Sequence, residues 1–437
     1  APGMLKKYWL TFFATLTNAC FMVAQFSQMF YVQFIEIFKL THTQLGILEG
    51  LGSIGGFVGG LIGGLLADRF SPRKLTALGC FVTAAAAVAE SFTHSYFLLI
   101  VIYFALSFSS NVLLMTPYFK LLKLLGTDEE QGKIMTFSET AFAIVTLAIN
   151  YGFLGAIEAM GLSFQASLRV VAAVCLLIGV GIWAFFRAPG LSAEEERIAH
   201  IKEQAKMQKE EHSAAPSGAF AEFLAVLKCP VLYLNIIATM TMTFFNQVIF
   251  VYMNPFLVNI LALAAGTASL YTITFKNVLR IVVSPFGGII RDKLNDSTVV
   301  LKIASLVLAA VMVVLAFAGG SSLALYLVLV VLAGVCIFSV TGLQYTLIAD
   351  AKLPAKYAGR IFGITFSLNS LTTLFRGTVC GRILDQKGYV AGFSTVFWIG
   401  FGACLLCAAS AIVLRKVIDN KKALSKEIQA EVDLATE

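Results

Sequence analysis

The stretch GLLADR at residues 64–69 recurs in the second half of the chain as GIIRDK at residues 288–293. Both copies read Gly-x-x-x-Asp-basic, both close a long apolar run, and they are offset by 224 positions. A second match, Gly-basic-Ile, lies in the loop predicted before each half's fifth apolar run, at residues 132–134 and 359–361, an offset of 227. Because two independent matches share nearly one offset, the sequence indicates a duplicated unit.

Long apolar runs occupy most of the sequence. Hydrophobic residues make up 58% of the 437 residues and charged residues only 13%, against roughly a quarter charged in a soluble domain, which excludes a water-soluble globule. A bilayer core of about 30 Å needs roughly 20 apolar residues in a helix. We predict twelve spans, at residues 9–38, 43–67, 75–93, 96–120, 134–158, 165–186, 229–258, 265–290, 298–318, 322–349, 358–381 and 391–414.

One long polar stretch divides the spans into six and six. It is rich in Ala, Glu, Lys and Gln and is punctuated by Pro-Gly and Pro-Ser-Gly, which is typical of a solvated helix between breakers. We predict an all-α polytopic membrane protein with twelve transmembrane helices in two six-helix halves. The N-terminal half covers 1–190, a cytoplasmic linker 191–228, and the C-terminal half with a cytoplasmic tail 229–437. We interpret the linker as a tether without chemistry.

The basic residues set the direction of the spans. Lys and Arg collect in cytoplasmic loops, and an inside N-terminus places most of the 32 Lys and Arg residues there. We therefore predict a multi-pass protein of the inner (plasma) membrane with both termini cytoplasmic.

Charge and cysteine patterns exclude several function classes. The net charge of +7 comes from basic residues that punctuate apolar runs, so we predict no nucleic acid partner. The eight cysteines lie inside or at the edge of apolar runs without CxxC spacing, which indicates small buried side chains and no metal site. The sequence has neither a phosphate-binding Gly-x-x-x-x-Gly-Lys-Ser/Thr loop nor His-Glu-x-x-His. We predict no cofactor and no enzyme activity.

The twelve spans, the two halves, the long linker and the repeated Gly-x-x-x-Asp-basic loop resemble the major facilitator superfamily of secondary transporters, over the whole chain. The resemblance implies that spans one, four, seven and ten line the cavity and that two, five, eight and eleven form the interface between halves. It also implies a gating role for Asp68, Arg69, Asp292 and Lys293. After Asp68-Arg69-Phe70 this chain departs from the family pattern of Gly and two basic residues and reads SPRK at 71–74.

Cations inside the predicted spans are candidates for substrate contacts, because a charge at mid-bilayer costs at least ~2.5–3.5 kcal/mol. Lys276 lies near the middle of span eight, Arg280 follows one turn later on the same face, and Arg376 lies in span eleven. Their positions resemble those in the oxalate/formate antiporter and monocarboxylate transporter branches, which implies an organic anion. The alternative is that the cations pair with protein carboxylates.

Neutral polar side chains on the expected cavity helices are further candidates for substrate binding. They could instead bond between helices, as interhelical polar contacts commonly do. These residues are Asn18, Gln25 and Gln28 of span one, Asn111 of span four, Asn246, Gln247 and Tyr252 of span seven, and Gln344 and Tyr345 of span ten.

Two acids, Glu49 and Glu139, are predicted to be the only ones more than one turn inside a span. They are candidates for proton coupling. By depth along the helices we also hypothesise two gating ion pairs, Glu139 with Arg280 on the cytoplasmic side and Glu49 with Arg376 on the outer side. Each pair would form in only one state of the carrier and so shift its equilibrium.

Glycines recur every four residues in span two. One stripe holds Gly52, Gly56, Gly60 and Gly64, and the next holds Gly55, Gly59 and Gly63. Such stripes let another backbone approach closely. We interpret them as tight packing, which is compatible with a surface along which the halves slide.

The sequence thus predicts a secondary active transporter that moves a small organic anion, such as a carboxylate, sulfonate or phosphate ester, by alternating access. A proton or sodium ion is the candidate co-transported species, and we expect a monomer in the lipid bilayer. The alternative is a carrier for a neutral solute, a sugar or drug, with structural intramembrane cations. A channel or a receptor would need neither the repeated loop nor the duplicated twelve-helix body.

Overall fold

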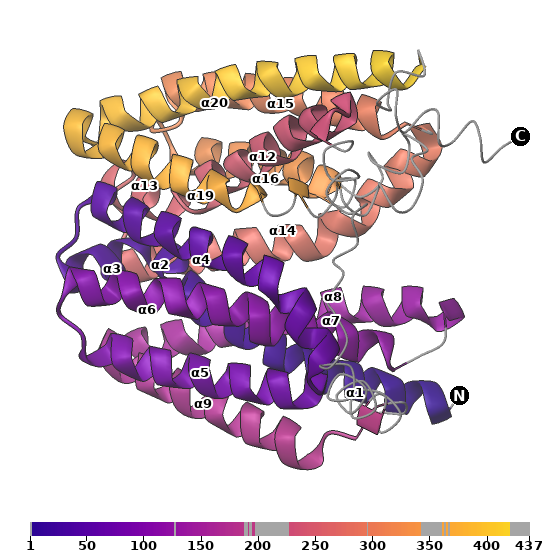
Figure 1. The fold of residues 1–437 in the computed structure, drawn as a ribbon. Coiled ribbons are helices and arrows are strands. Elements are labelled where there is room, and N and C mark those ends of the chain that lie inside the picture. Colours follow the sequence, from indigo (N-terminus) through magenta and orange to yellow (C-terminus); the bar gives the residue numbers. More distant parts are fainter. Residues whose placement is uncertain are drawn as a thin grey trace, which may run out of the picture. The chain divides into compact units, whose positions relative to one another are not determined.

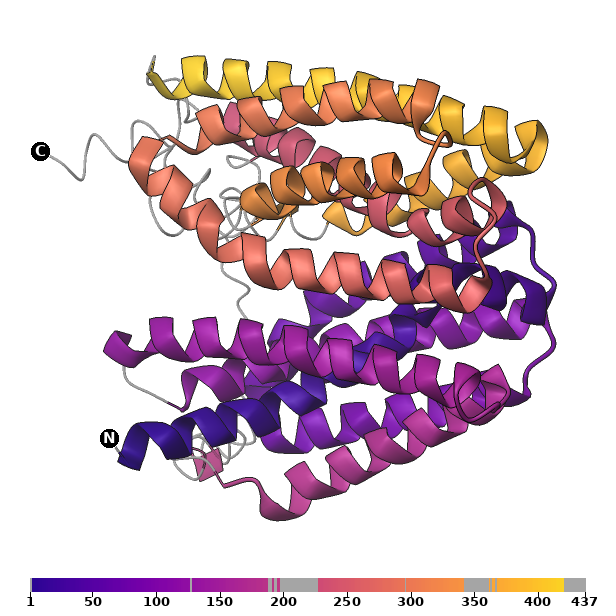
Figure 2. The same cartoon turned by 180° about the vertical axis from the view of Figure 1, so that it is seen from behind.

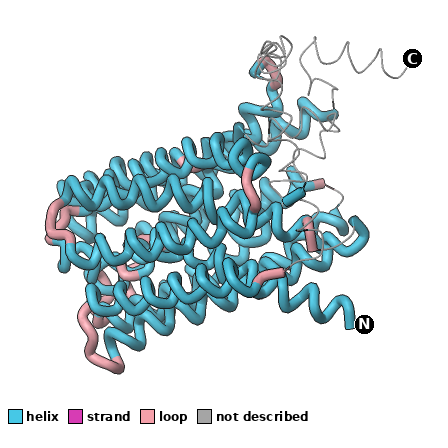
Figure 3. The backbone as a smooth tube through the Cα atoms, turned by 60° about the horizontal axis from the view of Figure 1, so that its bottom comes forward, coloured by secondary structure: helices cyan, strands magenta, loops and turns pink. Residues whose placement is uncertain are grey.

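The computed structural model describes residues 2–125, 128–187, 191, 195–196, 227–294, 296–341, 361, 364–365 and 368–419. These residues form helices joined by short loops, and they contain no strand (Figure 3). The chain divides into two compact units. Unit 1 comprises residues 1–212 and 264–277, and unit 2 comprises residues 213–263 and 278–437.

Unit 1 holds the first six predicted spans, drawn from indigo to magenta in Figure 1. Helices α5 and α9 pack side by side along it, as both Figure 1 and Figure 2 show. Its elements are α1 (Pro2–Ala19), η1 (Cys20–Gln25), α2 (Phe26–Met29), α3 (Tyr31–Phe38), α4 (His42–Arg69), α5 (Pro72–Phe92), α6 (Tyr96–Ser109), η2 (Ser110–Met115), α7 (Thr116–Lys123), α8 (Asp128–Glu158) and α9 (Phe164–Phe185).

Unit 2 holds most of the later spans, and α15 packs along α20 in it. Its elements are α12 (Pro230–Phe250), α13 (Met253–Asn259), α15 (Ser297–Ala318), α16 (Leu323–Thr341), α19 (Leu371–Phe375), η4 (Arg376–Cys380) and α20 (Gly381–Asp419). Helix α14 (Ala265–Leu294) contributes its first part to unit 1 and its second part to unit 2. Gly388, with φ of 72°, breaks α20 into two helices, because glycine tolerates this left-handed backbone.

Each of the twelve predicted spans overlaps a helix in the described part of the chain. Nine stretches of these residues are long and apolar enough to cross a membrane. Helices α4 and α14, with 28 and 30 residues, match spans two and eight. Many large apolar side chains are exposed, among them Leu177, Trp183 and Phe317, which fits a lipid-facing surface.

The repeated sequence features lie at comparable helix positions. The two Gly-x-x-x-Asp-basic copies lie at the ends of α4 and α14. The prediction that residues 132–134 lie in a loop is wrong, because α8 begins at Asp128 and includes these residues. Helix α8 opens with the acidic run Asp128-Glu129-Glu130. Acidic residues stabilise the N-terminus of a helix, which explains why α8 starts before Lys133.

The glycines of α4 pack against α6 and η2 within unit 1. A Cβ atom on Gly55 would lie 2.6 Å from the Phe104 carbonyl oxygen, and one on Gly59 would lie 2.5 Å from that of Phe108. A Cβ atom on Gly60 would meet nothing within 4 Å. The tight-packing interpretation therefore fits Gly55 and Gly59 and does not extend to Gly60.

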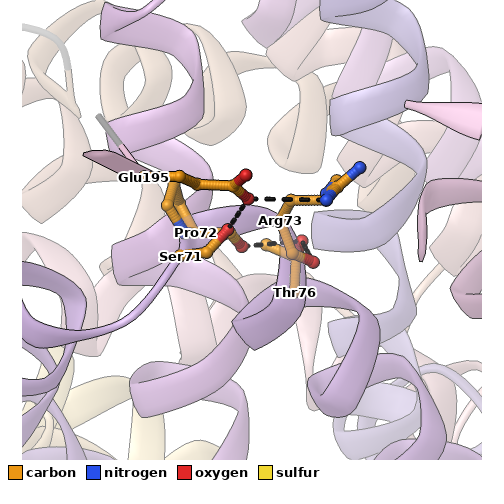
Figure 4. A network of polar contacts seen from close by, with 5 residues as sticks. All are labelled: Ser71, Pro72, Arg73, Thr76 and Glu195. Carbon is orange, nitrogen blue, oxygen red and sulfur yellow. Dashed lines mark hydrogen bonds and ion pairs between the residues drawn. The ribbon is translucent and has the colours of Figure 1, made fainter. Parts of the chain in front are cut away.

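Glu195 of the linker contacts the start of α5 (Figure 4). The Ser71 hydroxyl donates to Glu195 Oε1 at 2.6 Å, and Arg73 Nη2 lies 3.5 Å from the same oxygen. Ser71 is the N-cap residue of α5, but its side chain does not cap a backbone N–H. The carboxylate of Glu195 instead supplies the negative charge that a helix N-terminus favours. Ser71 and Arg73, in the sequence SPRK that departs from the family pattern, therefore serve as an attachment point for the linker.

Replacing Gly59 by Ala should destabilise the protein, since the added methyl group overlaps the Phe108 carbonyl and overpacking typically costs 1–3 kcal/mol. Gly60→Ala is the matched control, with no destabilisation expected because its Cβ meets open space and Ala favours a helix by about 1 kcal/mol. The melting temperatures of the purified variants in detergent measure the difference. Equal effects at both positions would contradict the packing described here.

Replacing Glu195 by Gln should loosen the linker, because the amide loses the ionic contacts with Arg73 and with the start of α5. A partly exposed pair contributes about 0.2–1 kcal/mol, so trypsin cleavage after Arg197 or Lys202 should become faster, on the order of two- to five-fold. Glu196→Gln, at an exposed neighbouring position, should leave the rate unchanged. Identical digestion of all three proteins would rule out the anchoring role of Glu195.

Candidate functional site

Arg376 lies at the centre of a polar cluster inside unit 2. It is only 1% exposed, although it carries a permanent charge. Its Nε donates to Gln247 Oε1 at 3.2 Å, and its guanidinium carbon lies 5.4 Å from the centroid of the Tyr252 ring. The Gln247 amide in turn donates from Nε2 to Thr373 Oγ1 at 2.8 Å. The guanidinium is therefore held by a side-chain amide and by the face of an aromatic ring.

The backbone around Arg376 is also unusual. Arg376 begins η4, a π-helical segment of five residues, and the Tyr252 hydroxyl donates to its carbonyl oxygen at 3.4 Å. In unit 1, span four contains another π-helical segment, η2, which holds Asn111. Short π-helical turns inside α-helices occur frequently at functional sites. Two predicted substrate-binding residues, Arg376 and Asn111, lie on such turns.

Two polar stripes face each other between α12 and span eleven. On span eleven, Thr365, Asn369, Thr372 and Arg376 recur at i, i+4, i+7 and i+11, one face of a helix. On α12, the polar residues that accompany this face are Asn235, Thr239 and Gln247, at i, i+4 and i+12. The Asn235 amide donates from Nδ2 to Thr365 Oγ1 at 3.1 Å. Since Asn235 meets Thr365 and Gln247 meets Arg376, the two segments run in the same direction with their polar faces together.

Four oxygen atoms in these stripes have no hydrogen-bond partner among the residues that the structure describes. They are Asn235 Oδ1, Thr239 Oγ1, Asn369 Oδ1 and Thr372 Oγ1, and all four are buried. Buried polar atoms in proteins are ordinarily bonded, and leaving one unsatisfied costs about 1–3 kcal/mol. The stripes beside Arg376 are therefore suited to a polar ligand that can bond to them.

The remaining predicted substrate residues are not all brought to this cluster. Gln247, Tyr252 and Arg376 are together, and Asn246 is half-buried on the same helix, α12. Gln344 and Tyr345 lie outside the described residues. Lys276 and Arg280 are half-buried on α14, Lys276 in the part that groups with unit 1 and Arg280 in the part that groups with unit 2.

In unit 1, the predicted amides are half-buried on the first and fourth spans. Asn18 lies on α1, Gln25 on η1 and Gln28 on α2. Asn111 donates from Nδ2 to the Ser107 carbonyl of its own helix at 2.9 Å, so its amide is used at least partly within the helix.

The predicted gating residues are only partly described. Asp68, Arg69, Glu139, Asp292 and Lys293 lie in described helical backbone, but their side chains fall outside the described part of the structure. Glu49 is 5% exposed and accepts a hydrogen bond from the Ser27 hydroxyl at 2.7 Å. Both hypothesised ion pairs stay predictions.

Sequence reasoning missed one buried acid. Glu90 on α5 is 0% exposed and accepts from the Tyr103 hydroxyl at 3.4 Å, although it lies less than one turn from the end of the helix at Phe92. The predicted boundary at residue 93 places Glu90 equally close to the end of its span, so distance from the helix end does not reveal this burial. A signal was available, because Thr76, Thr83 and Glu90 recur every seven residues on the buried face of α5.

Comparisons with known proteins agree with this architecture. The chain is 23% identical to the inner membrane protein YihN of Escherichia coli (strain K12), over 96% of this chain and 98% of that protein. It is 20% identical to the inner membrane protein YqcE of the same organism, over 88% of each chain.

Solved transporters share the fold at low sequence identity. A bacterial homolog of the human lysosomal transporter Spinster has a TM-score of 0.73 at 13% identity, covering 98% of this chain and 99% of that one. The nucleoside transporter NupG has a TM-score of 0.68 at 12% identity, covering 95% and 100%. A D-xylose-proton symporter has a TM-score of 0.64 at 17% identity, covering 93% and 95%.

Residues 11–375 match the family model of the Major Facilitator Superfamily. This match covers most of the chain, includes both copies of the repeated loop, and agrees with the helical fold of the related transporters. The chain is therefore a membrane transporter rather than an enzyme, and it belongs to the Major Facilitator Superfamily.

Proposed function

We propose that this protein is a secondary active transporter for a small organic anion and that Arg376 binds the acidic group of the substrate. The observation that carries the proposal is a wholly buried guanidinium beside buried oxygen atoms that lack partners among the described residues. Burying a charge is expensive unless it is paired and hydrogen-bonded. An anionic group would accept hydrogen bonds from the guanidinium and from the threonine hydroxyls, and hydroxyl or amide groups elsewhere on the substrate would donate to the asparagine oxygens.

The geometry of the cluster suits a carboxylate, sulfonate or phosphate ester. A guanidinium presents a planar fork of N–H groups that matches such anions in a bidentate manner. Gln247 engages Nε and the Tyr252 ring lies against the guanidinium, so both contacts limit how Arg376 can turn. Thr372 and Asn369 lie one and two turns before Arg376 on the same face, where they would bond hydroxyl or amide groups of the substrate.

The rest of the transport cycle is proposed from the sequence. Lys276 and Arg280 are further candidates for contacts with the anion, and the ion pairs of Glu139 with Arg280 and of Glu49 with Arg376 are candidates for gates. Alternating access follows if the substrate or the pairs favour one conformation over the other. The two curated relatives are inner membrane proteins, which supports an inner membrane location. The placement of both termini in the cytoplasm is proposed from the distribution of Lys and Arg alone.

A neutral solute is the competing substrate class. Two of the solved transporters that share the fold carry a nucleoside or D-xylose, and the contacts of Arg376 described above are with the neutral side chains Gln247 and Tyr252. In that case the role of Arg376 would be structural only: it would hold α12 against span eleven through Gln247 and Tyr252.

A thermal-shift screen of the purified protein separates these classes. Carboxylates, sulfonates and phosphate esters are compared with nucleosides and pentoses, and a ligand at 100 times its Kd stabilises the folded state by about 2.7 kcal/mol. We expect stabilisation by members of the anion set only. Stabilisation by neutral solutes alone would overturn the anion proposal.

Replacing Arg376 by Gln should then weaken binding of the best anion by about 10- to 150-fold, because hydrogen bonds to charged groups contribute about 1.5–3 kcal/mol. Arg376→Lys should recover only part of the affinity, since an ammonium lacks the planar fork. Arg382→Gln removes an exposed arginine from α20 and should bind like the wild type. Titration calorimetry measures all three, and unchanged affinity in both Arg376 variants would exclude contact with the anion.

A further inference from the structure

An apolar groove runs through unit 1 between α1, α8 and α9, which pack against one another. It consists of two adjoining cavities of about 500 Å³ and 490 Å³, and Leu16 and Ile178 line both. Along α1 the lining extends from Leu10 to Val23, which is about 20 Å at 1.5 Å per residue. One leaflet of the bilayer core is about 15 Å deep, so the groove is long enough to follow a lipid chain through its leaflet.

The walls of the groove are almost wholly apolar. Ser167 carries the only hydroxyl group among the residues that line the two cavities, all of which the structure describes. That hydroxyl donates to the Ser163 carbonyl at 3.0 Å. A polar solute would lose its hydrogen bonds with water here and find no replacement, whereas a hydrocarbon chain has none to lose.

The groove has a buried floor and an exposed rim. On the floor, Cys20 and Val23 are 1% exposed. On the rim, Val174 is 42%, Leu177 72% and Phe185 81% exposed. Because these helices cross a membrane, the medium that reaches the rim is lipid hydrocarbon. The groove can therefore be filled from the bilayer.

Basic and aromatic residues surround one end of the groove. Lys6 lies one turn before the first lining residue of α1, and Arg187 directly follows the last lining residue at the end of α9. Both basic side chains are exposed. Trp9 and Trp183, on the same ends of the two helices, are also exposed, and Trp is enriched at the level of the lipid headgroups. This end of the groove therefore carries positive charge at the membrane surface.

We propose that the groove binds an anionic phospholipid, with one acyl chain between α1 and α9 and the phosphate group beside Lys6 and Arg187. The chain gains little when it leaves the bilayer for the groove, because lipid tails are as apolar as these side chains. The headgroup therefore decides which lipid binds. Each Lys or Arg near a membrane surface gives an anionic lipid about a five-fold preference.

This inference goes beyond the proposed function, because it holds for an anionic and for a neutral substrate alike. The groove lies in unit 1, and Arg376 lies in unit 2. A lipid that binds one conformation of the carrier more tightly than the other would shift the equilibrium between them. The tests below contain no transported substrate, so their failure would leave the proposal for Arg376 intact.

Native mass spectrometry of the purified protein, titrated with phosphatidylglycerol or with phosphatidylcholine of the same chain length, tests the charged end. We expect one phosphatidylglycerol to bind about 25-fold more tightly than phosphatidylcholine, from two basic residues. The double variant Lys6→Gln/Arg187→Gln should lose this preference. Lys416→Gln removes an exposed lysine from α20 and should keep it. Equal affinity of the wild type for both lipids would overturn the proposal.

A second variant tests the apolar part of the groove. A Cβ atom on Gly181, which lines the groove, would meet nothing within 4 Å, so Gly181→Leu should fill the space without steric overlap. Binding of phosphatidylglycerol should fall at least ten-fold. Gly402→Leu on α20 has equally open space and should bind like the wild type. Melting temperatures without lipid check that both variants fold. Full binding by a folded Gly181→Leu would exclude a chain in the groove.

Two measurements on the wild type do not depend on any variant. A phosphatidylglycerol with a photoreactive group at the end of one acyl chain, in liposomes, should label residues 16–23 and 167–178, which line the deeper cavity. Labelling spread evenly over the exposed helices would contradict a defined site. Glycerol phosphate, which has the charge and no chain, should not displace the lipid; displacement at equal concentration would indicate a phosphate site without a groove and would overturn the proposal.

Discussion

The hydrogen bond between the Arg376 guanidinium and the Gln247 amide joins α12 to span eleven at the most buried charge in the described residues of unit 2. A charge in this position has to be surrounded by groups that bond to it. Gln247 is itself held by Thr373, and Asn235 meets Thr365 three turns away. Polar contacts therefore join these two helices at the arginine and again three turns away.

The two halves of the duplicated chain use their polar side chains differently. Unit 2 buries a cation with amide and hydroxyl groups, whereas unit 1 buries two acids with hydroxyl groups. Both units interrupt a helix with a π-helical turn, η2 and η4. The two turns lie in the fourth span of one half and the fifth span of the other, so the halves differ both in where the helix is interrupted and in the sign of the charge they bury.

The fold was largely accessible from the sequence because bilayer thickness fixes the length of an apolar run. Arg376 was found as well, since a charge deep in an apolar run is conspicuous. The residues that contact Arg376 were predicted only as candidates. The rotation of α12 about its axis decides whether Asn246 or Gln247 faces span eleven, and a helix that is apolar on all sides gives no sign of that rotation. The breaks at η1 and η4 were not predicted, since a short 3₁₀ or π-helical turn changes the hydrogen-bond register with little change in residue pattern. Glu90 was missed because its burial comes from the packing of α5 against neighbouring helices and not from its distance to the end of the span.

The two cross-helix bonds of unit 2 also limit how this chain can vary in length. Asn235 and Thr365 are 130 positions apart, and Gln247 and Arg376 are 129 apart, so α12 and span eleven keep one register over three turns. Inserting a single residue between Asn235 and Gln247 would rotate Gln247 by about 100° relative to Asn235, and no adjustment of the loops could restore both bonds. Insertions and deletions in this lineage should therefore be confined to the loops and the linker, while the segment from Asn235 to Gln247 keeps its length even where its residues change.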